Sequence, residues 1–369
     1  MFKLKCDDFL IYDEATGTYS MAADQKVRDE AERNKWKTTG WTILKDWRLY
    51  LMLVPMLLVY LLWRYLPMTE LFAAFKDPES ALEVKDQVWV GLSNFDSLFF
   101  GASQYEFWRA FRNTFIIAFY GLLFGFPFPI ILALFFNEVK SNVTRSILQV
   151  GVYLPKFMST VIITALAIVL FRGSTSGRGG TEGIGIISQL LMTLPHSAQF
   201  EAEVIGATNG LVFTNRYFRA IYQITGLWEH GGYDSIVYFA AVIAVSPTSY
   251  EAAQIDGAGK MAQMRYVVIP SILSTVVIML IMKIVGLLSV GYEKIYLLLG
   301  TGKLPANSTA APESNYEVAD VVSTLANSWG DAGERALGTA AEMLNNLIGM
   351  ILVLGSNAIA RKASDVSLY

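Results

Sequence analysis

Six separate runs of apolar residues, each close to the length of a membrane-spanning helix, dominate this sequence. They lie near 49–66, 114–136, 147–171, 220–245, 267–291 and 341–360. A helix needs about 20 residues to cross the hydrocarbon core, and it satisfies its own backbone hydrogen bonds there. The alternation and frequent turns of membrane strands are absent. We therefore predict an all-α membrane protein with six transmembrane helices; six such runs argue against the alternative, a large soluble protein with buried helices.

The composition agrees with a membrane protein. Hydrophobic residues make up 53% of the 369 positions and charged residues 17%, compared with about 25% charged residues in soluble domains. A net charge of −3, with no dense Lys/Arg cluster among aromatics, argues against nucleic-acid binding. The single cysteine, Cys6, excludes an internal disulfide framework. The polar start has no apolar core or cleavage site, so we expect no signal peptide and expect the first spanning helix to direct insertion.

The distribution of positive charge predicts the topology. If the N-terminus is cytoplasmic, the inner segments are 1–48, 137–146, 247–266 and 361–369, and the outer loops are 67–112, 172–219 and 292–338. The inner segments hold 15 Lys/Arg in 87 residues, whereas the longer outer loops hold 11 in 141. Because cytoplasmic loops are enriched in positive charge, we predict that both termini are cytoplasmic.

The chain divides into an N-terminal extension, residues 1–47, and one membrane domain, residues 48–369. The charged stretch Asp24–Lys37 favours either an exposed helix or a disordered arm. Gly173–Gly185 and Gly300–Ser314 have the composition of flexible outer loops. Neither contains the Lys-Ser/Thr pair of a P-loop, so we expect no nucleotide site in this chain.

The loop 247–270, between the fourth and fifth runs, has the pattern of a short helix that a partner can grip. Glu251 suits the first turn of such a helix, and the alanines that follow keep it thin. Gly257 and Gly259 let the chain turn back and let a partner approach closely, and Pro270 suits the start of the next helix. The residues expected to form this coupling surface are Glu251, Ala252, Ala253, Asp256, Gly257, Ala258 and Pro270.

This loop resembles the EAA motif of ABC-importer permeases, which is Glu-Ala-Ala, three residues, Gly, nine residues, and a short apolar stretch ending in Pro. Here Gly257 follows Ala253 after three residues, and nine residues separate Gly257 from Val267. The sequence departs from many sugar permeases at Met264, where an aromatic residue is common. Met264 therefore affects the expected contact of this helix with a pocket on its partner, but it leaves the spacing of the motif unchanged.

The resemblance extends over about residues 49–369, to permeases of maltose-type importers of oligosaccharides and polysaccharides. It is carried by Ala74–Asp77, Trp89–Phe95, Phe107–Thr114, Phe124–Pro127, Leu132–Leu134, Asn137–Lys140, Tyr153–Pro155, Gly291–Glu293 and Ser367–Tyr369. The resemblance implies the type I ABC importer permease fold in a bacterial cytoplasmic membrane. It also implies a second homologous permease, two cytoplasmic ATPase subunits that hold ATP and Mg²⁺, and an extracytoplasmic solute-binding protein. The chain itself would carry no cofactor or metal and would not be an enzyme.

The fourth run contains the best candidates for contact with an oligosaccharide. Trp228, Glu229, Tyr233 and Tyr238 combine aromatic faces with polar groups, which suits the alternating faces of a sugar ring. Ionisable groups at membrane depth need a wet cavity or a partner. The alternative is an aromatic belt at the membrane interface. We favour Tyr233 and Tyr238, with Glu229 hydrogen-bonding the substrate hydroxyls.

Charged residues near the fifth run form a second group of candidates. Tyr292 and Glu293 follow that run, and an ion pair of Glu293 with Lys294 is the structural alternative. Asp234 stands where the resembling permeases commonly have Gly, so any role for it is particular to this chain. Lys283 also lies within the fifth run, and a pair with the second permease is its structural alternative.

We therefore predict a transmembrane permease subunit that imports an oligosaccharide by alternating access. A small sugar or a polyol is the alternative substrate. A secondary transporter or channel would favour ion-coordinating acids at midplane and inverted repeats, and no convincing repeat is visible. A membrane-anchored sensor would need a larger cytoplasmic domain than 47 residues.

Overall fold

A computed structural model describes residues 10–13, 18–21, 47–77, 87–173, 183–206, 211–299 and 316–363. The chain forms two compact units, residues 1–70 and 71–369. The predictions for Asp24–Lys37 and Gly300–Ser314 fall outside the described residues, as does most of Gly173–Gly185. The sequence predicted a domain boundary after residue 47, where the polar N-terminal extension meets the first apolar run. That boundary stays a prediction.

The N-terminal unit begins with a β-hairpin that the all-α prediction did not include. Strands β1 (Leu10–Asp13) and β2 (Thr18–Met21) pair antiparallel. Both are short runs containing aromatic or β-branched residues, which favour strands. Helix α2 (Trp47–Tyr60) follows and continues as a π-helical turn, Leu61–Tyr65, into a 3₁₀ segment, Leu66–Phe75.

In the second unit, helices are joined by loops, and the described residues contain no strand apart from one isolated bridge between Lys76 and Trp89. Its first half contains α3 (Ser93–Phe100), α4 (Gln104–Gly125), α5 (Pro127–Glu138), α6 (Asn142–Tyr153), α7 (Thr160–Leu170), α8 (Ile186–Thr193) and α9 (Ala198–Gly206). Its second half contains α10 (Asn215–Ile243), α11 (Pro247–Ile255), α12 (Lys260–Gln263), α13 (Ile269–Val285), α14 (Tyr292–Leu299), α15 (Tyr316–Ala319), α16 (Val322–Asp331) and α17 (Arg335–Ala363). Short turns at Leu154–Phe157, Leu211–Phe213 and Met264–Val268 complete the set.

Among the described residues, four helical segments are long and apolar enough to cross a membrane. They are Tyr50–Phe75, Gln104–Glu138, Lys260–Val285 and Arg335–Ile359. Two bent pairs, α6 with α7 and α10 with α11, raise the number to six if each pair is one span. The predicted apolar helices of spanning length are thus confirmed by length and composition, whereas the predicted number of six depends on these pairs.

The third apolar run, expected as a single span, is broken in the structure. Helix α6 leads into the 3₁₀ turn at Pro155, and α7 leaves at 100° to it. Proline donates no backbone hydrogen bond, and the Ser159 hydroxyl caps the new helix by accepting from the Ile162 N–H at 3.4 Å. This break brings Lys156 and Thr160 beside α10.

Glycines allow α10 to approach its neighbours closely. A Cβ at Gly232 would lie 2.1 Å from the Val152 carbonyl oxygen of α6, and one at Gly231 would lie 2.6 Å from the Phe128 ring of α5. Any larger side chain at Gly232 would therefore force the helices apart. These contacts position the stretch of α10 that carries the ionisable residues relative to α5 and α6.

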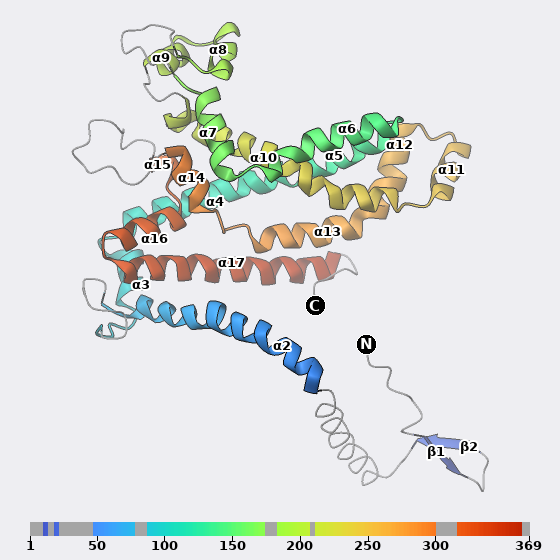
Figure 1. The fold of residues 1–369 in the computed structure, drawn as a ribbon, viewed down its shortest axis with the longest axis horizontal. Coiled ribbons are helices and arrows are strands. Elements are labelled where there is room, and N and C mark those ends of the chain that lie inside the picture. The colour runs from blue at the N-terminus through green and yellow to red at the C-terminus, as the bar shows by residue number, and fades with distance from the viewer. Residues whose placement is uncertain are drawn as a thin grey trace. The chain divides into compact units, whose positions relative to one another are not determined.

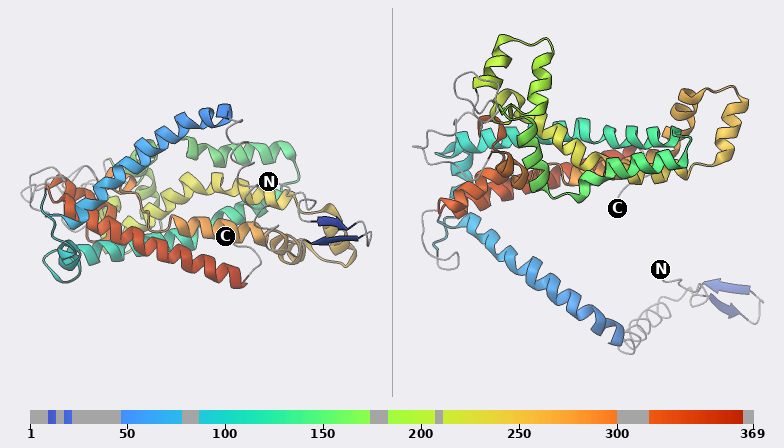
Figure 2. Two further views of the ribbon diagram at one scale, coloured as in Figure 1. Left: turned by 90° about the horizontal axis from the view of Figure 1, so that it is seen from below. Right: turned by 45° about the horizontal axis from the view of Figure 1, so that its top comes forward.

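Polar side chains hold α4 against α15 at one end of the second unit. The Asn113 amide donates to the carbonyls of Glu317 and Asp320, at 2.8 and 3.0 Å, and Arg109 pairs with Asp320 at 2.8 Å. Helices α3, α14, α15 and α16 lie at one end of the unit, whereas α11 and α12 lie at the opposite end (Figures 1 and 2). The loops predicted to face opposite sides of the membrane are therefore at opposite ends.

Candidate functional site

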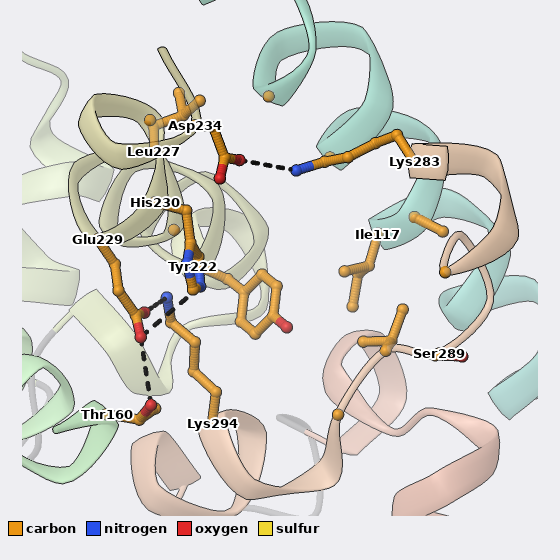
Figure 3. Close-up of a pocket in the computed structure, with 18 of the residues that line it drawn as sticks. Ile117, Thr160, Tyr222, Leu227, Glu229, His230, Asp234, Lys283, Ser289 and Lys294 are labelled. Atoms are coloured by element: carbon orange, nitrogen blue, oxygen red, sulfur yellow. Dashed lines mark hydrogen bonds and ion pairs between the residues drawn. The ribbon is translucent and has the colours of Figure 1, made fainter. Parts of the chain in front are cut away.

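A cavity of about 680 Å³ opens beside the middle of α10. Its walls come from α4, the start of α7, α10, the end of α13, the segment 286–291 and α14. Figure 3 shows side chains from these separate helices converging on this space. Its charged and titratable lining residues are Lys156, Glu229, His230, Asp234, Lys283, Glu293 and Lys294.

Glu229 is the centre of a network on one wall. Its Oε2 atom accepts from Lys294 Nζ at 3.0 Å, and its Oε1 atom accepts from the Thr160 hydroxyl at 3.2 Å. The two charged side chains are only 6% and 11% exposed. Lys294 Nζ also lies 5.3 Å from the centre of the Tyr222 ring. Breaking such an enclosed pair by removing one partner costs about 3–5 kcal/mol, so this pair holds α10 and α14 in register.

His230 extends the network toward the broken span. Lys156 Nζ donates to His230 Nδ1 at 2.8 Å. Because an ammonium group can only donate, the ring proton belongs on Nε2, which lies 3.6 Å from Glu229 Oε1. The ring therefore links the lysine after Pro155 to the Glu229 carboxylate.

A second ion pair joins α10 to α13. Asp234 Oδ2 on α10 meets Lys283 Nζ on α13 at 3.1 Å. Lys283 lies in the last turn of α13, where a positive charge suits the helix dipole. The side chains are 29% and 43% exposed, so the pair is open to the cavity. The sequence suggested a partner for Lys283 on the second permease, whereas the structure pairs it with Asp234 of this chain.

The cavity brings together only some of the residues predicted for the substrate pathway. Glu229 and Glu293 line it. Trp228 and Tyr233 lie on α10 but outside the cavity lining, and Tyr292 lies outside it on α14. Lys294 pairs with Glu229, so the alternative considered from the sequence, a Lys294–Glu293 pair, is wrong.

The two favoured tyrosines occupy different environments. Tyr238 is buried, at 3% exposed, and its ring meets Phe126 edge-on at 6.3 Å. Tyr233 is 44% exposed and meets the Phe157 ring at 6.3 Å. Their proposed contact with substrate stays a prediction, and in this conformation neither ring faces the cavity.

Sequence reasoning missed several polar residues of the cavity wall, among them Lys156, Thr160 and Tyr222. Lys156 directly follows Pro155 within an apolar run. A charge beside a proline inside a predicted span is the signal that would have indicated a break lining a polar space.

The coupling loop lies at the far end of α10, and its first helix, α11, is mostly exposed. Helix α11 contains Glu251, Ala252 and Ala253, and none of its residues is buried. Asp256 ends it, and Gly257 turns the chain with a φ of +76°. The Ala258 N–H then bonds the Ala253 carbonyl at 2.9 Å. Pro270 lies in the first turn of α13.

Two contacts brace this loop against the end of α5. Lys260 forms an ion pair with Glu138, and the Tyr250 side chain hydrogen-bonds Asn137. A cavity-facing helix, α10, thus leads directly into α11, a helix with no buried residue. No cluster of three or more His, Cys, Asp or Glu side chains that could hold a metal is found among the described residues.

Residues 125–309 match the family described as "Binding-protein-dependent transport system inner membrane component". The matched segment contains both the charged helix α10 and the loop 247–270. The chain is 32% identical to Protein LplB of Bacillus subtilis, across 93% of this chain and 98% of that protein. It is 34% identical to the polygalacturonan/rhamnogalacturonan transport system permease protein YteP of the same organism, across 87% and 90% of the two chains.

Two crystal structures of a bacterial alginate ABC transporter contain a chain with the same fold. One describes the import of "the acidic polysaccharide alginate"; its chain has a TM-score of 0.71 and 32% identity, covering 89% of this chain and 99% of that one. The other holds the transporter with an alginate pentasaccharide-bound periplasmic protein, with a TM-score of 0.72, 31% identity, and 89% and 98% coverage.

Proposed function

Because this chain belongs to the family of binding-protein-dependent transport system inner membrane components, and its homologues are carbohydrate ABC transporter permeases, we propose that it imports an oligosaccharide by alternating access. It acts as a multi-pass subunit of a bacterial cytoplasmic membrane, with both termini inside. The observation that carries this proposal is a polar cavity on α10, the helix that leads into the exposed coupling loop.

The charged cavity supports a hydrated, polyhydroxylated substrate. Carboxylates, ammonium groups and the Thr160 hydroxyl line a space of about 680 Å³ between spanning helices. Ion pairs at membrane depth mark substrate pathways, and such groups can exchange hydrogen bonds with sugar hydroxyls. The cavity has room for a few sugar rings, since ligand pockets span about 300–1,000 Å³. This favours an oligosaccharide over the alternative, a small sugar or a polyol.

The partners follow from the same assignment. A second homologous permease completes the pathway, and an extracytoplasmic solute-binding protein delivers the substrate. Two ATPase subunits, holding ATP and Mg²⁺, grip the loop that contains Glu251, Ala252, Ala253, Asp256, Gly257 and Ala258. Closure of the ATPase pair moves this loop, and α10 transmits the movement to the cavity. The permease then changes between two arrangements that different ligands favour.

Purification of the intact complex tests the assignment and the substrate size together. Two ATPase copies should accompany this chain and a second permease, and the solute-binding protein should bind labelled oligosaccharides more tightly than monosaccharides. A lone oligomer of this chain, active without ATPase subunits, would instead indicate a channel or secondary transporter. If the solute-binding protein binds a monosaccharide or a polyol more tightly than oligosaccharides, the substrate is the alternative, a small sugar or a polyol.

A further inference from the structure

The three lysines that line the cavity are held in different ways. Lys294 is enclosed and paired with Glu229, at 11% and 6% exposed. Lys156 donates to His230 at 2.8 Å. Both belong to the connected network on one wall, so neither can turn to a ligand without breaking other contacts. They are fixed parts of the cavity wall.

Lys283 differs from the other two lysines. It contacts Asp234 at 3.1 Å, and in the described part of the chain neither side chain forms another hydrogen bond or ion pair. Both are open to the cavity, at 43% and 29% exposed. Figure 3 shows the two side chains reaching toward each other from α10 and α13, away from the Glu229 group. A partly exposed ion pair is weak and exchangeable.

We propose that Lys283 binds a carboxylate of an acidic oligosaccharide, and that Asp234 occupies this place when substrate is absent. The inference rests on the proposed importer function. A uronate carboxylate is the same chemical group as the Asp234 side chain, so it can replace Asp234 at the Lys283 ammonium group. The displaced Asp234 carboxylate remains exposed to cavity water. A neutral sugar has no negative charge, so it cannot neutralise the Lys283 ammonium group as Asp234 does.

The same exchange lets the substrate leave. A site along a transport pathway must bind well enough to admit its ligand and weakly enough to release it. An uncompensated lysine in this cavity would hold a polyanionic chain tightly. Asp234 competes with the substrate for Lys283, so each substrate carboxylate is released and the sugar chain can move on. The pair therefore selects for acidic substrates without trapping them.

Opposite effects of two neutralising substitutions test the proposal. The complete complex is reconstituted in vesicles, and import of a galacturonate oligosaccharide and an alginate oligosaccharide is measured with loaded binding protein. Lys283→Gln should lower import about tenfold, the loss of one charge-assisted hydrogen bond. At low substrate, Asp234→Asn should raise import, because Lys283 loses its competitor. At saturating substrate the same variant should slow import, because Asp234 no longer displaces the bound carboxylate. Arg335→Gln, an exposed arginine at the start of α17, is the charge-matched control and should import as the wild type does.

A purely structural ion pair gives a different pattern. Both single variants would then lose import alike, and Asp234→Asn with Lys283→Gln together would restore it; the proposal expects the double variant to match Lys283→Gln. Loss of import at low substrate in both single variants, or change in neither, overturns the proposal. If the wild type imports neutral oligosaccharides and neither acidic one, the carboxylate site is wrong while the importer function stands. If it imports no oligosaccharide, the proposed function itself fails.

Discussion

Glu229 was expected to contact substrate, and the structure also pairs it with Lys294. Its contribution to stability can be measured separately from any contribution to transport. Its carboxylate neutralises Lys294 in an enclosed contact. Glu229→Gln should therefore destabilise the purified complex by about 3–5 kcal/mol, because it leaves a buried ammonium group unpaired. Glu293→Gln, at a cavity residue with no ion pair among the described residues, is the control. Thermal unfolding of the assembled complex measures both.

A double substitution shows whether the Glu229 effect arises from the pair. Glu229→Gln together with Lys294→Met removes both charges, so it should recover most of the lost stability. If Glu229→Gln unfolds at the wild-type temperature, the pair does not hold α10 to α14.

The two tyrosines of α10 should respond differently to alanine. Tyr238 is buried against Phe126, so Tyr238→Ala should cost about 3–5 kcal/mol of stability, as large aromatic truncations do. Tyr233 is half exposed, so Tyr233→Ala should leave unfolding nearly unchanged and slow import if the ring contacts substrate. Unfolding and import are compared in the same preparations. Wild-type import of several glycan lengths by Tyr233→Ala would remove this residue from the pathway.

At the scale of elements, the sequence predicted the apolar helices and the coupling loop but not the bend within the third run. Hydrophobic periodicity gives the length of an apolar run, but it does not reveal where a proline and a capping serine divide it. The change of direction at Pro155 and Ser159 depends on packing against α10. That bend brings Lys156 and Thr160 into the cavity, so missing it also meant missing them.

Helical spacing alone also gave an incomplete view of α10. It places Tyr233 near the face of Glu229, yet Glu229 is enclosed and Tyr233 is open. Which part of a helix face is covered depends on neighbours from distant parts of the chain, here α7 and α14. The N-terminal hairpin was missed for another reason, since two four-residue strands leave little periodic signal.

The coupling loop makes a prediction about Gly257. Its φ of +76° disfavours a side chain, and no atom of the described residues lies within 4 Å of an added Cβ. Gly257→Leu should leave the complex assembled, with ATP hydrolysis that no longer responds to loaded binding protein. Gly257→Asn is the matched variant, because Asn tolerates a positive φ and adds a smaller side chain.

The two Gly257 variants separate strain from blocked docking. If Gly257→Asn keeps stimulated ATP hydrolysis, the defect of Gly257→Leu arises from backbone strain or from the size of the leucine side chain. If both variants lose stimulation, the partner requires a glycine, with no side chain, at this position. Normal stimulation and uptake by Gly257→Leu would remove the loop from the coupling mechanism.

For the whole molecule, the predicted topology places the coupling loop inside the cell. In a Cys6→Ser background, a cysteine at Lys260 should react with a membrane-permeant thiol reagent only. A cysteine at Ser308, in the predicted third outer loop, should react with an impermeant reagent added to intact cells. Labelling of position 260 by the impermeant reagent would reverse the orientation.

ATP-driven import by the complete complex tests the central claim most directly. Vesicles containing this chain, its partner permease and both ATPase subunits are given binding protein loaded with labelled oligosaccharide, with ATP on the ATPase side. The account predicts that label accumulates inside against its gradient only when ATP and binding protein are both present. Accumulation without ATP, driven by an ion gradient alone, would contradict it.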